Sequence, residues 1–199
     1  EKDFFRRLYA YDLALTYRPD PRHRFTLTAN NRYLQHDTPS EGNFDDHDEL
    51  SYGAGLEWQA DWARRFMTRY RLLASRRQYA FLLAERSQDN YTQRNLRMDF
   101  SFRWDILNQL TVSGEQAVYV NYNVKDFEDR NRTNRSTRNL QTDLRLRYRP
   151  LRKLDVELDI SRREIHVSYL NWEAFSETTL DTTVFYNLTG TGRLTIGNG

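Results

Sequence analysis

Apolar and charged residues alternate along this chain with a period of two, and this alternation restricts the possible folds more than any other feature. In residues 140–148 the even positions are Leu or Tyr apart from one Thr, while the odd positions are Gln, Asp, Arg and Arg. Residues 154–160 repeat the pattern, with Leu, Val, Leu and Ile set against Asp, Glu and Asp. Because successive side chains of a β-strand point to opposite faces, these segments predict strands with one apolar and one strongly polar face.

The same alternation recurs along the whole chain and predicts an all-β fold of about ten long antiparallel strands. Short turns are expected near residues 19–22, 61–64, 105–108, 150–153 and 190–192, so successive turns lie 40 to 45 residues apart. Longer polar stretches are expected to form loops at 36–48, 76–93, 125–138 and 165–179. Each repeat therefore holds two strands rather than the four of a propeller blade, which indicates an up-and-down arrangement.

Composition removes several classes of protein. The chain has no Cys, which excludes disulfides and thiolate metal sites, and 30 basic against 28 acidic residues is not the charge balance of a nucleic-acid-binding protein. No run of about 18 apolar residues exists, so no transmembrane helix is expected. The charged fraction of 29% would suggest disorder, but an aromatic fraction of 14% argues against it.

Aromatic residues precede each short turn and share the parity of the apolar positions. Aromatic rings at one height on an apolar surface are typical of the girdle of a membrane barrel, where they contact both lipid and headgroups. The predicted membrane-interface aromatics are Tyr17, Trp58, Trp104, Tyr148 and Tyr186, with Tyr33, Tyr52 and Tyr122 as candidates for a second girdle near the long loops.

Charged residues on the opposite parity predict a water-filled lumen. If the hairpin at 149–153 pairs residues whose numbers sum to 302, Arg147 lies opposite Asp155 and Arg145 opposite Glu157. A sum of 214 for the preceding hairpin places Phe100 over Gly114. The predicted lumen-lining residues are Arg69, Arg71, Arg97, Asp99, Arg103, Glu115, Asp143, Arg145, Arg147, Asp155, Glu157 and Asp159.

With these features the chain resembles bacterial outer-membrane β-barrel proteins over its whole length. The resemblance implies short periplasmic turns, long extracellular loops and a lipid-facing apolar band in the outer membrane of a Gram-negative bacterium. The hairpins at Tyr17–Pro21 and Tyr148–Leu151 are similar to those of large barrels, such as lipopolysaccharide-export or electron-conduit porins. Residues 1–7 lack the apolar core of a signal peptide, and residues 196–199 lack the terminal aromatic residue usual in the family. We therefore expect residues 1–199 to form one barrel domain or a barrel segment, and we prefer part of a larger transmembrane β-barrel. A closed ten-stranded barrel is the alternative.

One segment admits a different secondary structure. Between residues 60 and 90, Trp62, Phe66, Tyr70 and Leu73 fall at helical spacing. A strand with Phe66 and Tyr70 on its apolar face continues the hairpin repeat on both sides, and the strand is the interpretation that we prefer.

Residues able to carry chemistry are sparse, and neither a catalytic site nor a cofactor is expected. The four His residues show no metal-ligand spacing. Asp45, Asp46 and Asp48 form a weak Ca²⁺ candidate, for which a solvated loop is the preferred interpretation. The same interpretation is preferred for Arg130, Arg132, Arg135 and Arg138, which could otherwise attract an anionic sugar or lipid headgroup.

The pattern favours a hydrophilic, charge-lined pore or a transport or export channel that is not an enzyme. Its expected partners are the lipid bilayer and lipopolysaccharide, with no nucleic acid. The first alternative is a structural barrel that anchors or sheathes a partner protein in its lumen or on its long loops. The second is a soluble antiparallel β-sheet protein.

Overall fold

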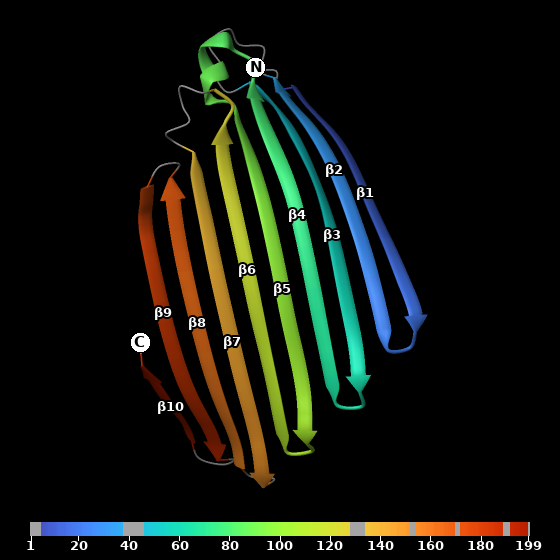
Figure 1. The fold of residues 1–199 in the computed structure, drawn as a ribbon, viewed down its shortest axis with the longest axis vertical. Coiled ribbons are helices and arrows are strands. Elements are labelled where there is room, and N and C mark those ends of the chain that lie inside the picture. Colours follow the sequence, from blue (N-terminus) through green and yellow to red (C-terminus); the bar gives the residue numbers. More distant parts are fainter. Residues whose placement is uncertain are drawn as a thin grey trace.

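Ten antiparallel strands lie side by side in sequence order and form one sheet (Figure 1). This computed structural model describes residues 5–37, 46–127, 134–151, 154–169, 172–188 and 192–198. A short 3-10 helix, η1 (Ala84–Asp89), lies between β4 and β5. The strands are β1 (Phe5–Asp20), β2 (His23–Asp37), β3 (His47–Ala63), β4 (Phe66–Phe81), β5 (Tyr91–Leu107), β6 (Leu110–Lys125), β7 (Arg135–Leu151), β8 (Leu154–Tyr169), β9 (Trp172–Leu188) and β10 (Gly192–Asn198).

The prediction of an all-β, antiparallel up-and-down fold is confirmed. Every strand pairs with its neighbours in sequence, and among the described residues no ladder joins β1 to β10, so the sheet is open rather than a closed ten-stranded barrel. In the described part of the chain, no helix is long and apolar enough to span a membrane.

The sheet is a single layer, and its two faces differ sharply in chemistry. Among the described side chains, the buried hydrophobic ones are those of Leu34 and Ala60. The apolar face instead leaves large side chains exposed; Tyr11, Leu13 and Leu15 keep 72%, 65% and 61% of their surface accessible. No second layer of the described chain covers this face, which distinguishes it from the inner face of a β-sandwich.

The strands are staggered in a regular way. One row of directly paired residues runs through Tyr17, Trp58 and Phe100, which lie three, five and seven residues before the ends of their strands at Asp20, Ala63 and Leu107. Each hairpin is therefore displaced along the strand direction by two residues relative to the preceding hairpin, or by one residue per strand. Figure 1 shows the short turns stepping diagonally across the end of the sheet. With a rise of ~3.3 Å per residue and a strand spacing of ~4.8 Å, this stagger corresponds to a strand tilt of about 35°, as barrels require.

The predicted loops are shorter than expected, and much of their sequence is strand. The segment 165–179 is nearly all β8 and β9, and β4 and β5 extend into 76–93 around η1. In these stretches aromatic and aliphatic side chains such as Tyr79, Phe81 and Val167 take the parity of the charged face, so the apolar alternation of the rest of the strand does not continue. The ladder continues nevertheless, because pairing satisfies the backbone N–H and C=O groups whatever the side chains are. The preferred strand over Phe66–Phe81 is confirmed as β4.

Both explicit register predictions were wrong by two residues. Tyr148 pairs with Val156 rather than Leu154, so residue numbers in this hairpin sum to 304. In the preceding hairpin Phe102, not Phe100, lies opposite Gly114. A shift of two residues keeps every side chain on its predicted face, so the alternation alone does not reveal the error.

The Phe102 ring occupies the space above Gly114 on the apolar face. A Cβ atom at Gly114 would lie 2.5 Å from Cε1 of this ring. We expect Gly114→Ala to lower the free energy of unfolding by about 1 kcal/mol, because the ring must swing away from the strand. A double-mutant cycle by chemical denaturation provides the measurement. The same alanine should cost little in a Phe102→Ala background, and an equal cost in both backgrounds would disprove the contact.

Candidate functional site

The charged face of the sheet carries all twelve predicted lumen-lining residues. Direct pairs such as Arg71 with Asp99, Glu115 with Asp143, and Arg145 with Asp159 place these side chains on a common face. The alternation fixes the same face for the other members of the set. They are Arg69, Arg97, Arg103, Arg147, Asp155 and Glu157. Whether this face lines a lumen stays a prediction.

Ion pairs between β7 and β8 form the densest part of the charged face. Arg145 Nε lies 3.1 Å from a Glu157 oxygen and 2.6 Å from an Asp159 oxygen. Arg147 Nη2 lies 2.5 Å from Asp155 Oδ2. The contacts expected between Arg147 and Asp155 and between Arg145 and Glu157 therefore exist, although they run diagonally because of the two-residue difference in register. Such exposed pairs stabilise a fold by about 0–1 kcal/mol each, so they serve mainly to hold the guanidinium groups in place.

A second cluster centres on Glu57, which was not among the predicted lumen-lining residues. Its Oε2 atom lies 2.7 Å from Arg69 Nη2 and 3.2 Å from Arg71 Nη2. Glu57 lies between the outward-facing Leu56 and Trp58 in β3, and this alternation was a sufficient signal to place it on the charged face.

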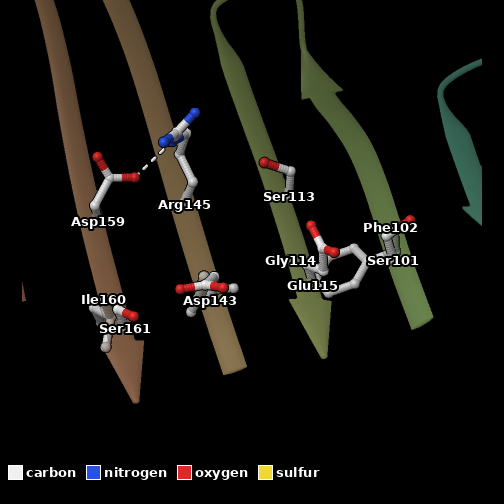
Figure 2. A pocket seen from close by; sticks show the side chains of 11 residues that line it. Ser101, Phe102, Ser113, Gly114, Glu115, Asp143, Arg145, Asp159, Ile160 and Ser161 are labelled. Atoms are coloured by element: carbon white, nitrogen blue, oxygen red, sulfur yellow. Dashed lines mark hydrogen bonds and ion pairs between the residues drawn. The ribbon is translucent and has the colours of Figure 1, made fainter. Parts of the chain in front are cut away.

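A hollow of ≈ 630 Å³ lies on the charged face between β5 and β8. Glu115 and Asp143 are directly paired across β6 and β7 at this site, and Gln141 donates a hydrogen bond of 2.8 Å to Asp143. Figure 2 shows Arg145 and Asp159 pointing toward each other beside these carboxylates. Acidic and basic groups therefore face the same space, a surface suited to water and to hydrophilic solutes of either charge.

Close to the short turns, a hollow of ≈ 520 Å³ is lined by several arginines around one acid. Asp105 accepts a hydrogen bond of 2.7 Å from the Thr111 hydroxyl, which lowers the pKa of this carboxyl group, and Arg103 lowers it further. Asp105 lies on the turn side of the Trp104 ring. The arginines are Arg65, Arg103, Arg147 and Arg149.

On the apolar face, the predicted interface aromatics lie near the ends of their strands. Tyr17, Trp104 and Tyr148 each precede the last residue of a strand by three positions, and 62%, 48% and 41% of their surfaces are exposed. Trp58 is further from its turn and packs against Phe25, with ring centroids 5.8 Å apart. The predicted aromatic side chain of Tyr186 lies outside the described residues.

The candidates for the second girdle lie toward the opposite ends of the strands. Tyr52 and Tyr122 are on the apolar face and are 43% and 41% exposed. The Tyr33 hydroxyl donates a hydrogen bond of 2.9 Å to Asp48, one of the three Ca²⁺ candidates.

The set of three Ca²⁺ candidates stays a prediction. Asp45 lies outside the described residues, while Asp46 precedes β3 and Asp48 lies within it. In the parts of the chain that the structure describes, no group of three or more His, Asp or Glu side chains could hold a metal ion. Of the arginines predicted to lie in one solvated loop, Arg135 and Arg138 belong instead to β7, while Arg130 and Arg132 lie outside the described residues.

A solved structure with a similar arrangement of strands is titled "Copper transporter OprC". It superimposes with a TM-score of 0.67 over 98% of this chain, at 11% sequence identity. The shared fold is a β-barrel wall of long, staggered antiparallel strands. The match covers 36% of the OprC chain, so this barrel wall spans about a third of that protein's length.

Other comparisons add no family assignment to this barrel wall. The β domain of the Bordetella autotransporter BrkA matches with a TM-score of 0.40 at 11% identity, over 99% of this chain and 86% of that one. No protein-family model matches the chain, and no curated protein matches its sequence.

Proposed function

We propose that this chain forms part of the wall of a β-barrel in the bacterial outer membrane, and that its charged face lines a path for hydrophilic solutes. The observation that carries the proposal is the contrast between the two faces of a single-layer sheet. One face exposes Leu, Tyr and Trp side chains, and the other carries paired Arg, Asp and Glu side chains. Exposed apolar surface of this extent is costly in water and is stable against lipid.

The dimensions of the apolar face support a membrane location. On β5 the apolar positions run from Trp104 to Leu96, with Arg94 as the next outward residue. Ten residues separate Trp104 from Arg94, and at a tilt of about 35° they rise roughly 27 Å along the barrel axis. The outward apolar band of outer-membrane barrels is about 25 Å tall.

The charged face supports passage of hydrophilic solutes without strong charge selection. Arg145 and Arg147 are balanced by Asp155, Glu157 and Asp159 at short distance. A lumen of mixed sign hydrates ions of both charges and repels neither.

Conductance in planar bilayers tests the proposal with the complete barrel that contains this wall, reconstituted from detergent. We expect stable channels with weak ion selectivity. Replacing the paired carboxylates, Glu115→Gln with Asp143→Asn, should move the reversal potential in a salt gradient toward anion selectivity, because the net charge facing the hollow becomes more positive. Thr142→Val, on the apolar face of β7, is the matched control and should leave the reversal potential unchanged. A protein that inserts but conducts no ions would refute the open path and would favour a lumen filled by a partner protein.

A further inference from the structure

A hollow of ≈ 620 Å³ opens on the apolar face, at the end of the sheet away from the short turns. Its floor contains two small residues, Ala54 and Ala74, which are directly paired across β3 and β4. Leu96, Tyr52 and Tyr122 also line it and are 39%, 43% and 41% exposed. The two adjacent alanines beside these larger side chains create a depression in the apolar face.

Two arginines border this hollow on its long-loop side. Arg76 and Arg94 are directly paired across β4 and β5 on the apolar face. Arg76 Nη1 donates a hydrogen bond of 3.2 Å to the Tyr52 hydroxyl, while its Nε atom is buried without a hydrogen-bond partner. Among the described residues, neither guanidinium is paired with a carboxylate. Like charges directly opposite each other destabilise a sheet, and an anion bound between the two guanidinium groups would offset this repulsion.

The position of these arginines along their strands, relative to the aromatic residues near the short turns, indicates the kind of anion that they would meet. Phe66 and Trp104 are directly paired across β4 and β5. Arg76 lies ten residues from Phe66, and Arg94 lies ten residues from Trp104. Arg138 on β7 is also ten residues from an interface aromatic, Tyr148. Three outward arginines therefore lie at one border of the apolar band, where an arginine costs about 0–1 kcal/mol against 2–4 at the midplane. This border is the level of lipid headgroups.

We propose that Arg76 and Arg94 bind the phosphate of an anionic membrane lipid, with one acyl chain of that lipid in the hollow over Ala54 and Ala74. The proposal rests on the membrane location proposed above. Two guanidinium groups on adjacent strands can each donate hydrogen bonds to one phosphate, the geometry that arginine favours. The phosphate neutralises the paired positive charges, and the apolar hollow accepts the chain that a free anion lacks. A phosphate-bearing lipid fits both parts of the site, whereas inorganic phosphate fits one.

Native mass spectrometry of the detergent-solubilised protein, titrated with diphosphoryl lipid A, tests the site. We expect Arg76→Gln with Arg94→Gln to weaken lipid binding by about tenfold or more, since the charge-assisted hydrogen bonds to the phosphate are lost. Arg97→Gln removes a charge from the other face of β5 and serves as the matched control, with binding unchanged. Ala74→Leu keeps both arginines but fills the hollow, and it should also weaken binding.

Two further measurements distinguish a lipid phosphate from free phosphate, and the lipid site from the membrane location. Lipid A stripped of its phosphates should bind at least about tenfold more weakly, and inorganic phosphate at the same concentration should not displace the intact lipid. Equal binding by the arginine double variant, by the Ala74→Leu variant or by the dephosphorylated lipid would overturn the proposal, as would displacement by inorganic phosphate. Flotation with vesicles reports on membrane insertion independently. Loss of flotation by the wild-type protein would refute the membrane location itself, whereas normal flotation with unchanged lipid binding in the variants would refute the lipid site alone.

Discussion

A cysteine at Ala117 is expected to react quickly with a membrane-impermeant thiol reagent, whereas a cysteine at the next position, Val118, is expected to remain unlabelled. Ala117 lies on the charged face of β6, in one ladder row with Asp99 and Gln141, and Val118 lies on the apolar face opposite Met98. The reactive species is the thiolate, which forms readily in a water-filled path and is suppressed in hydrocarbon. We expect the labelling rates of the two positions to differ by about two orders of magnitude or more.

The chain suits this measurement because it has no native cysteine and therefore no background reaction. The adjacent positions Ser161 and Ile160 provide a second pair on β8, with Ser161 on the charged face. After unfolding in denaturant, all four single-cysteine proteins should react equally, which controls for intrinsic reactivity. Fast labelling at both members of each pair in intact membranes would contradict the lipid-facing assignment and favour a soluble sheet.

The assignment of faces was predictable from the sequence because it depends on parity alone. Arg145 and Glu157 were placed on one face and Leu144 on the other, and the structure agrees. Register was not predictable in the same way. A slip of two residues preserves each face, and the choice between the alternatives depends on the geometry of the turns, which the alternation does not encode.

The ends of the strands and the partners of charged residues were harder to predict. Beyond the apolar band, as in residues 165–169 of β8, the alternation reverses: Ile165, Val167 and Tyr169 take the parity of the charged face. A search for one continuous apolar face therefore ends too early, while backbone pairing carries the strand on. Glu57 was overlooked although its parity in β3 placed it on the charged face. Its ion pairs with Arg69 and Arg71 were not predictable, because these partners lie on the next strand and the register brings them together. The hollow beside Arg76 and Arg94 was likewise invisible until the register aligned Ala54 with Ala74.

The largest expected loss of stability follows from placing a charge on the apolar face at mid-height. Leu144 on β7 lies four residues from Tyr148 and six from Arg138, which mark the two borders of the band, and it is 40% exposed. Leu144→Arg should lower the free energy of unfolding in lipid vesicles by about 2–4 kcal/mol, the cost of a guanidinium near the bilayer midplane. Denaturant titration followed by tryptophan fluorescence measures the change.

The matched control is Gln141→Arg, which adds the same charge to the same strand at a nearby height but on the charged face. Gln141 lies beside Asp143 and donates a hydrogen bond to it, so an arginine there gains a carboxylate partner and remains in water. We expect its effect to stay within about 0.5 kcal/mol. The introduced side chain and the added charge are the same for both variants, so the difference between them reports mainly the cost of replacing an apolar contact with lipid by a charge. Equal effects of the two arginines would mean that both faces contact water, and the membrane location would then have to be abandoned.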